Sequence, residues 1–326
     1  MKKGIVLGKF LPLHKGHLGL IDFALQHCDF LYIIVCASSD ENTDGMIRKQ
    51  WLYQELREKN NISLISFPYN QNILPNTSRS SRIVSEKWAK AIKEVVPDAE
   101  IVFTSEEYGD YLAEYMGITH LAFDKSRVQF PISASRIQSD PFTYWHYLAD
   151  AAKPWYIKKV AILGTESTGK SVLAEKLAQY FDTIFVPEMA REIIEETEEC
   201  TFSDLEEIAL LHSKTIGKKI GDANKLLFLD TDINITKSYS KFLFNRELVT
   251  EPWLEQANKS DLYLFLEPDC PFVQDGTRLD EKERDRLSLA HKEFLKSNNI
   301  DFISIRGDWE DRFNSAVDII KKKYFA

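Results

Sequence analysis

The chain has 326 residues, of which 44% are hydrophobic and 28% are charged, and its formal net charge is −9 at pH 7. This length and composition predict two globular cores and exclude a mainly disordered chain. The longest apolar run, residues 30–37, is far shorter than the roughly 20 residues of a transmembrane helix. Polar residues return at Lys9, too early for a signal peptide. We therefore expect a cytoplasmic protein that is not embedded in a membrane.

The acidic balance also bears on partners. The pI is 5.4, and the basic block at residues 321–323 is short. Binding to nucleic acid through its phosphates needs many clustered cations, so we expect no nucleic-acid partner. An anionic ligand must instead be recognised at a local site.

Short β-branched or aromatic runs alternate with amphipathic stretches, which is typical of βαβ units and parallel sheets. In the first half we expect strands at residues 4–8, 30–37, 62–67, 101–104 and 119–123, with a surface loop at residues 70–82. The pattern breaks near residues 150–154. It resumes with strands at residues 156–164, 183–186, 226–230, 262–266 and 300–305. The sequence thus predicts two tandem α/β domains, residues 1–152 and 153–326, both with parallel sheets.

The first expected strand leads into a turn with two histidines. Gly8, Lys9 and Phe10 are followed by His14 and His17, which lie three residues apart and so share one face of a helical turn. An HxGH pattern at such a turn can donate hydrogen bonds to nucleotide phosphates. A zinc site is the weaker alternative, because no third ligand is evident. A pair of structural histidines is the other alternative.

The strand at residues 156–164 leads into a glycine-rich turn and then a helix. The turn matches G-x-x-x-x-G-K-[ST], a pattern whose backbone N–H groups surround phosphates. Lys170 is expected to bridge β- and γ-phosphate oxygens, and Ser171 to hold Mg²⁺. The full set of predicted phosphate-binding residues is Gly164, Thr165, Glu166, Ser167, Thr168, Gly169, Lys170 and Ser171.

Carboxylates follow two further strands of this half. Asp230 is the expected metal ligand, and Asp232 is read either as a group that orients or deprotonates an acceptor hydroxyl or as a helix N-cap. Glu188 and Arg191 are read as a ligand-binding pair or as the start of a surface helix. Residues 275–278 are read as a lid that brings Arg278 to the γ-phosphate or as a solvated loop.

Taken together, these motifs resemble the NadR-type bifunctional enzymes, in which a nicotinamide-nucleotide adenylyltransferase is joined to a ribosylnicotinamide kinase. The segments that carry the resemblance are GxFxPLHxGH at residues 8–17, residues 104–107, 124–127 and 140–145, the P-loop, the DTD segment at 230–232 and residues 275–278. The resemblance implies a Rossmann-like nucleotidyltransferase fold followed by a P-loop kinase fold.

The implied function is NAD salvage in two ATP-dependent steps, both using Mg²⁺. Nicotinamide riboside is phosphorylated to the mononucleotide, which then attacks the α-phosphate of a second ATP to give NAD and pyrophosphate. His14 and His17 are carried over as phosphate and transition-state contacts, and Ser133 and Ser135 as hydroxyls that receive the β- and γ-phosphates, with Arg136 beside them. Supply of the riboside by a transporter and assembly into a homo-oligomer are compatible with this reading.

The chain departs from the family pattern at two places. The second adenylyltransferase motif, ISx[ST]xxR, would place arginine at position 138, where this chain has Gln138, and Arg136 lies about 200° away around a helix. Some members also carry an N-terminal helix-turn-helix domain, which is not expected here because the first strand begins at Gly4. Two other hypotheses stay open: a kinase with a vestigial adenylyltransferase module, and a non-catalytic NAD or ATP sensor.

Overall fold

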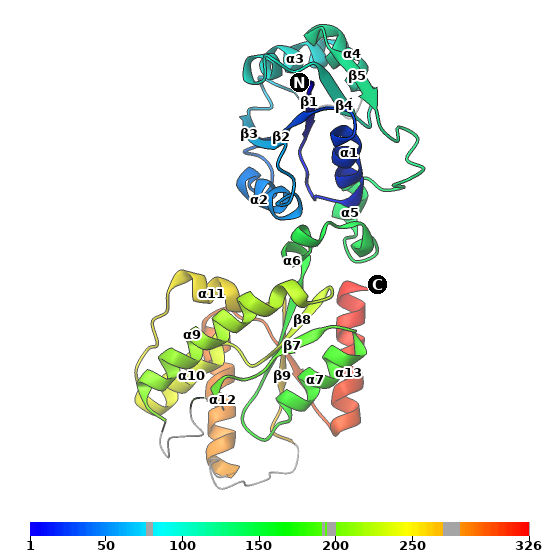
Figure 1. Ribbon diagram of the computed structural model, residues 1–326. Coiled ribbons are helices and arrows are strands. Elements are labelled where there is room, and N and C mark those ends of the chain that lie inside the picture. The colour runs from blue at the N-terminus through cyan, green and yellow to red at the C-terminus, as the bar shows by residue number, and fades with distance from the viewer. Residues whose placement is uncertain (76–80, 191–192, 194–199, 270–280, 326) are drawn as a thin grey trace. The chain divides into compact units, whose positions relative to one another are not determined.

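The computed structural model describes residues 1–75, 81–190, 193, 200–269 and 281–325. It divides into two compact units, Met1–Trp155 and Tyr156–Ala326. Among the described residues each unit contains a five-stranded sheet in which all strands run parallel. The division lies three residues after the boundary expected from the sequence. Figure 1 shows the elements of each unit.

The first unit alternates strands and helices along the chain. Its strands are β1 (Lys3–Gly8), β2 (Phe30–Ser38), β3 (Ile62–Tyr69), β4 (Ile101–Thr104) and β5 (Thr119–Ala122). Its helices are α1 (Lys15–Leu25), α2 (Gly45–Glu55), α3 (Arg82–Val95), α4 (Tyr108–Met116), α5 (Ala134–Ser139) and the 3₁₀ turns η1 (Trp145–Tyr147) and η2 (Asp150–Ala152). Helix α6 (Lys153–Tyr156) contains the division between the units.

Helices cover both faces of the first sheet, whose strand order is β3-β2-β1-β4-β5. Successive side chains of a strand point to opposite faces, and Ile5 and Val6 of β1 accordingly belong to two different buried clusters. Helices α1 and α2 contribute to the cluster of Val6, whereas α3 and α4 contribute to that of Ile5. This is the expected Rossmann-like arrangement, and it leaves the carboxyl ends of the strands for ligands.

Strand β3 extends furthest beyond the range that the sequence indicated. The strand expected at residues 62–67 continues through Pro68 to Tyr69. Proline has no N–H to donate, but β3 is the outermost strand of the sheet, where one side of the ladder is unpaired. The expected loop at 70–82 also ends earlier, because Arg82 is already the first residue of α3. Residues 76–80 of that loop lie outside the described residues.

The second unit is built in the same way. Its strands are β6 (Lys158–Leu163), β7 (Ile184–Val186), β8 (Leu226–Asp230), β9 (Leu262–Leu266) and β10 (Ile303–Ile305). Its helices are α7 (Lys170–Tyr180), α9 (Phe202–Lys219), η3 (Ile220–Asp222), α10 (Ile233–Phe244), α11 (Pro252–Asn258), α12 (Glu281–Ser297) and α13 (Trp309–Tyr324). Strands β7 and β10 begin later than expected, and a left-handed residue, Asp182 or Asn299, precedes each of them.

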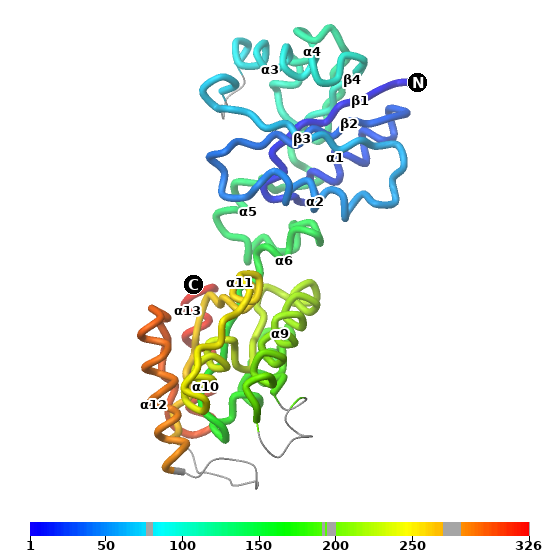
Figure 2. The backbone as a smooth tube through the Cα atoms, turned by 90° about the vertical axis from the view of Figure 1, so that its left-hand side faces the viewer, coloured from blue at the N-terminus to red at the C-terminus, as the bar shows by residue number. Residues whose placement is uncertain are grey.

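The strand order of the second sheet is β10-β9-β6-β8-β7, so β6 lies between two strands that follow it in the chain. All five residues of β8 are buried, as a strand covered on both faces requires. Helices α7 and α13 lie on one face of the sheet and α9, α10 and α12 on the other (Figure 1). Figure 2 shows α10 alongside α12, in agreement with their many contacts. Within the described part of the chain, no helix is both long and apolar enough to traverse a bilayer.

Candidate functional site

The two predicted histidines stack on each other in the turn that follows β1. His14 is the N-cap of α1, and its Nδ1 accepts a hydrogen bond of 3.1 Å from the backbone N–H of Gly16. The rings of His14 and His17 are 3.8 Å apart between centroids, and the buried ring of Phe10 meets His17 edge-on at 5.0 Å. The structure therefore brings the first-unit residues of the motif together.

Both imidazoles are neutral at physiological pH. Burial, together with the nearby positive charge of Arg127, lowers the pKa of His14 to about 4. Burial lowers the pKa of His17 well below its usual value, with smaller contributions from His14 and Arg127. Because Nδ1 of His14 accepts a hydrogen bond, its proton is assigned to Nε2, which is then a donor. Nδ1 of His17 is buried without a hydrogen-bond partner among the described residues, so it is a polar group that a bound molecule could satisfy.

A buried arginine that the sequence did not single out holds this turn in place. Arg48 of α2 is fully buried and donates hydrogen bonds to the carbonyl oxygens of Lys9, at 2.8 Å, and Cys36. It also pairs with Glu41, whose other carboxylate oxygen lies 2.8 Å from Nζ of Lys9. Glu41 thus forms ion pairs with both Lys9 and Arg48. No local pattern distinguishes Arg48 from the other basic residues of an amphipathic helix.

Helix α5 lies beside the histidine turn and carries the second predicted motif. Its N-cap is Ser133, whose side chain accepts from the backbone N–H of Arg136, and Ser135 is in its first turn. Gln138, which stands where the family pattern has arginine, donates from Nε2 to the carbonyl oxygen of Leu11 at 2.8 Å. The guanidinium of Arg136 donates to the hydroxyl of Tyr144 and lies 4.7 Å above that ring.

The glycine-rich turn after β6 has the positive φ angles that a tight turn at its glycines requires. Gly164 and Gly169 have φ angles of +145° and +83°. A Cβ atom at Gly164 would lie 2.8 Å from the carbonyl oxygen of Leu266, so only glycine fits there. Helix α7 begins at Lys170 directly after the turn. The backbone N–H groups of a helix N-terminus are therefore presented at this site.

Lys170 is nearly buried and donates from Nζ to the carbonyl oxygen of Thr165 at 3.0 Å. The positive charge of Lys170 acts on His291 of α12, a residue that the sequence analysis did not identify. Burial, reinforced by Lys170, lowers the pKa of His291 to about 3. Nδ1 of His291 contacts Oγ of Ser238 at 2.8 Å, and its Nε2 has no hydrogen-bond partner among the described residues.

Asp230 and Asp232 occupy different environments at the end of β8. Asp230 is buried and pairs with Ile162 of β6, the strand that leads into the P-loop. Asp232 is the N-cap of α10, and its carboxylate accepts from the backbone N–H groups of Asn234 and Ile235 and from the Asn234 side chain. Burial raises the pKa of Asp232 to about 6, although these hydrogen bonds oppose the rise. Asp232 is therefore the N-cap of α10, which is one of the two roles that the sequence suggested for it.

Glu188, two residues after β7, lies on the same side of the site as two aromatic groups. Its charge acts on buried His212 of α9 and on Tyr239 of α10. The hydroxyl of Tyr239 donates to the carboxylate of Glu166 in the P-loop at 3.4 Å, and its ring meets His291 edge-on. Tyr239 thus contacts the P-loop and is also affected by the charge of Glu188. Two other predicted residues, Arg191 and Arg278, together with the segment 275–278, lie outside the described residues.

The P-loop and the end of β8 offer hard oxygen donors of the kind that Mg²⁺ uses. Within the described ranges, no group of three or more His, Cys, Asp or Glu side chains could hold a metal by itself. The Ser171 hydroxyl and the Asp230 carboxylate are hard oxygen donors from adjoining segments. Mg²⁺ uses one or two such protein ligands together with substrate phosphates and water. The residues therefore fit Mg²⁺ bound with a nucleotide rather than a preformed metal cage.

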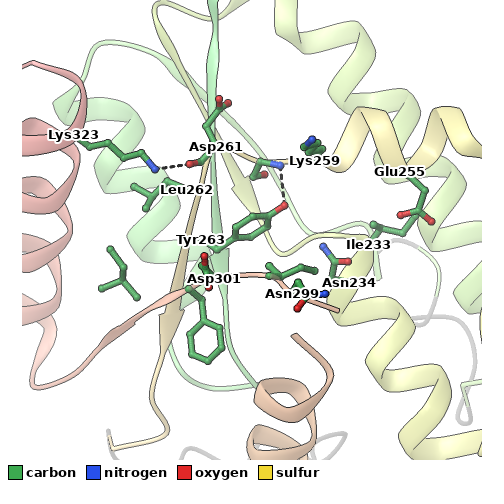
Figure 3. Close-up of a pocket in the computed structure, with 14 residues that line it drawn as sticks. Ile233, Asn234, Glu255, Lys259, Asp261, Leu262, Tyr263, Asn299, Asp301 and Lys323 are labelled. Carbon is green, nitrogen blue, oxygen red and sulfur yellow. Dashed lines mark hydrogen bonds between the residues drawn. The ribbon is translucent and has the colours of Figure 1, made fainter. Parts of the chain in front are cut away.

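A cavity of about 560 Å³ lies elsewhere in the second unit (Figure 3). Its walls include residues that precede β9 and β10, such as Asp261 and Asp301, and Lys323 of α13. Tyr263 accepts from the backbone N–H of Ser260 at its edge. The cavity shares no residue with the P-loop, although its wall includes Asn234, whose side chain donates to the carboxylate of Asp232.

The fold and these two turns define a class of protein. It is a tandem α/β protein with a Rossmann-like nucleotidyltransferase fold followed by a P-loop kinase fold. The AAA domain family matches residues 159–312, which include the P-loop. Two crystal structures of NadR protein, one in complex with NAD and AMP-PNP and one in complex with NR, have the same fold with a TM-score of 0.78. Their sequence identities are 21% and 22%, and the matches cover 100% of this chain and 96% of theirs.

Sequence relatives identify the family. The trifunctional NAD biosynthesis/regulator protein NadR of Salmonella typhimurium is 32% identical over 340 residues, a match that covers 98% of this chain and 82% of the relative. The protein of the same name from Escherichia coli is 32% identical over 345 residues with the same coverage. The chain belongs to the NadR family.

Proposed function

We propose that this protein is a cytoplasmic NAD-salvage enzyme with two ATP-dependent activities. It phosphorylates nicotinamide riboside to nicotinamide mononucleotide, and it then transfers an adenylyl group from a second ATP to the mononucleotide. One observation carries the proposal: a neutral histidine pair and a P-loop with an intact lysine occur in one chain, each directly after a strand of its own parallel sheet. The names of the NadR relatives, which refer to NAD biosynthesis, support it.

The kinase activity is assigned to residues 153–326. Lys170 donates to the carbonyl oxygen of Thr165, and an ammonium has further N–H donors that can reach β- and γ-phosphate oxygens. Ser171 and Asp230 would hold Mg²⁺, which supplies neutralisation of phosphate charge. Arg278 is proposed as a further contact to the transferred phosphoryl group, and Arg191, with Glu188, as a ligand-binding residue after β7.

We assign the role of general base in this step to Glu188. The 5′-hydroxyl oxygen of the riboside forms a bond to the γ-phosphorus, the bond from that phosphorus to the bridging oxygen of ADP breaks, and the hydroxyl proton passes to the base. Glu188 is partly exposed, and its negative charge favours the protonated forms of Tyr239 and His212. Asp232 is fully buried and its carboxylate is already occupied by the cap of α10. Its contribution is therefore to position α10, which carries Tyr239.

The adenylyl transfer is assigned to residues 1–152. A phosphate oxygen of the mononucleotide forms a bond to the α-phosphorus of ATP, and the bond to the leaving pyrophosphate breaks. Nε2–H of His14 and the imidazole of His17 are neutral donors for the oxygens that gain charge. Gly8, Lys9 and Phe10 shape the turn, whereas Ser133, Ser135 and Arg136 are proposed to receive the β- and γ-phosphates.

One observation favours a second candidate function, a kinase whose adenylyltransferase unit is weak. Gln138 is neutral, and its amide donates to Leu11 instead of presenting a charge to pyrophosphate. Loss of one preorganised donor slows acyl or phosphoryl chemistry by roughly 100- to 1000-fold. The second unit retains its motif in full, so the kinase step would be unaffected.

Product analysis separates the two candidates. Purified protein is incubated with nicotinamide riboside, Mg²⁺ and ATP, and the products are resolved by chromatography. A bifunctional enzyme produces mononucleotide and then NAD and pyrophosphate. A kinase with a weak adenylyltransferase unit produces mononucleotide that accumulates. Unaltered riboside would rule out the proposed kinase activity.

A further inference from the structure

An exposed tryptophan rests directly on the P-loop. Trp309 is the first residue of α13, and the edge of its six-membered ring lies against Gly169. A Cβ atom at Gly169 would be 1.9 Å from Cζ3 of Trp309 and 2.2 Å from its Cη2, so only glycine allows this approach. Despite the contact, 51% of Trp309 is exposed to solvent. One edge of the ring is thus fixed on the phosphate-binding turn while much of its surface stays open.

A buried arginine fixes this ring relative to the P-loop. Arg312, one turn further along α13, is 1% exposed. It donates to the carbonyl oxygen of Thr168 in the P-loop at 2.6 Å, to that of Gly307 before α13 at 2.8 Å and to that of Glu267 after β9 at 2.9 Å. Three loops at the carboxyl end of the sheet are therefore joined through one guanidinium. The start of α13, which carries Trp309, is thereby held against the P-loop, and the Arg312 guanidinium lies 5.8 Å from the centre of the Trp309 ring.

From this geometry we propose that Trp309 is the stacking platform for the base of the nucleoside triphosphate whose phosphates occupy the P-loop. The inference rests on the proposed kinase function and adds the residue that recognises the base. A planar base gains from stacking on an aromatic ring, and a rigid ring loses little entropy when the base binds. Tyr239, the aromatic residue bonded to Glu166, is partly buried against the cluster of α9 and α10, so it offers less open surface than Trp309, which is half exposed.

The test compares a ligand that has a base with one that lacks it. Kinase rates give the apparent KM for ATP, and inorganic tripolyphosphate added as a competitor gives its Ki at the same P-loop. We expect Trp309→Leu to raise the KM for ATP by about 5- to 150-fold, the range found for loss of one base-stacking contact. The Ki for tripolyphosphate should stay unchanged, and Trp309→Phe should retain most of the affinity for ATP. Trp253→Leu is the matched control, because Trp253 is 48% exposed and belongs to α11.

A second readout does not depend on turnover. ATP should quench the tryptophan fluorescence of the full chain, and most of that quench should be absent in Trp309→Phe. Equal weakening of ATP and tripolyphosphate in Trp309→Leu would show that the ring only supports the turn, and this would overturn the proposal. An unchanged KM for ATP would overturn it as well. Quenching through Trp309 without any formation of mononucleotide would instead leave the platform standing and remove the proposed kinase function.

Discussion

Gln138 and Leu11 are joined by a hydrogen bond of 2.8 Å from the side-chain amide to the backbone carbonyl. They lie 127 residues apart in the chain, and the bond ties α5 to the turn that carries His14 and His17. The residue that departs from the family pattern therefore has a structural role of its own. Position 138 is close enough to the histidine turn for a charged side chain to act there.

Gln138→Arg is expected to increase adenylyl transfer by tenfold or more. Arginine has enough N–H donors to keep the bond to Leu11 and adds a charge for leaving pyrophosphate, and one preorganised donor contributes about 100- to 1000-fold at best. The rate of pyrophosphate release with mononucleotide and ATP measures the effect. Gln138→Leu is the control that removes the donor without adding charge. An unchanged rate in Gln138→Arg would show that the missing charge does not limit this step.

The two activities are expected to be lost separately. Lys170→Ala should slow mononucleotide formation by roughly 100- to 1000-fold, because one charged phosphate donor is removed, and should leave adenylyl transfer intact. His17→Ala should have the reverse effect. Separate assays with riboside and with mononucleotide check this, and Lys176→Ala, an exposed lysine of the same helix α7, is the control. Loss of both activities in one variant would contradict independent sites.

The sequence predicted the strands and both turns because their signals are local. Strand β8 is a continuous apolar run, and the P-loop needs positive φ angles at its glycines, which only a few residues around them determine. The end of β3 was predicted too early, before Pro68. Proline is tolerated in this strand because β3 is at the edge of the sheet, and the sequence alone does not show which strand is at the edge.

The residues that support the sites could not be found in this way. Arg312 reaches Thr168 across 144 positions and His291 reaches Ser238 across 53. Helix α12 is rich in charged residues, so its pattern gave no reason to expect a fully buried histidine. Arg127, which acts on the histidine pair, was visible only as part of a resembling segment. Such contacts arise from tertiary packing, and one sequence contains no record of them.

Asp232 and Glu188 are expected to respond differently to loss of charge. Asp232→Asn keeps an oxygen that can cap α10, because asparagine is as good an N-cap as aspartate, so turnover should stay within about threefold, or about 0.6 kcal/mol. Glu188→Gln removes the proposed base and should reduce turnover by about 100-fold or more. Steady-state rates of mononucleotide formation test both. If Asp232→Asn showed the larger loss with an intact fold, the base would be Asp232.

Acid should destabilise the fold through its buried histidines. In the unfolded chain an imidazole takes up a proton as the pH falls through about 6.5, whereas His291 in the fold stays neutral until about pH 3 and His14 until about pH 4. The unfolded state thus binds more protons in this range, and stability rises with pH. Between pH 7 and pH 5 each of the two residues should lower the free energy of unfolding by about 2 kcal/mol. Urea titrations of the wild type and of His291→Gln at both pH values measure this. Between pH 7 and pH 5 the free energy of unfolding of the wild type should fall by about 2 kcal/mol more than that of His291→Gln. If both proteins lost the same amount over this range, His291 would not be held neutral in the fold.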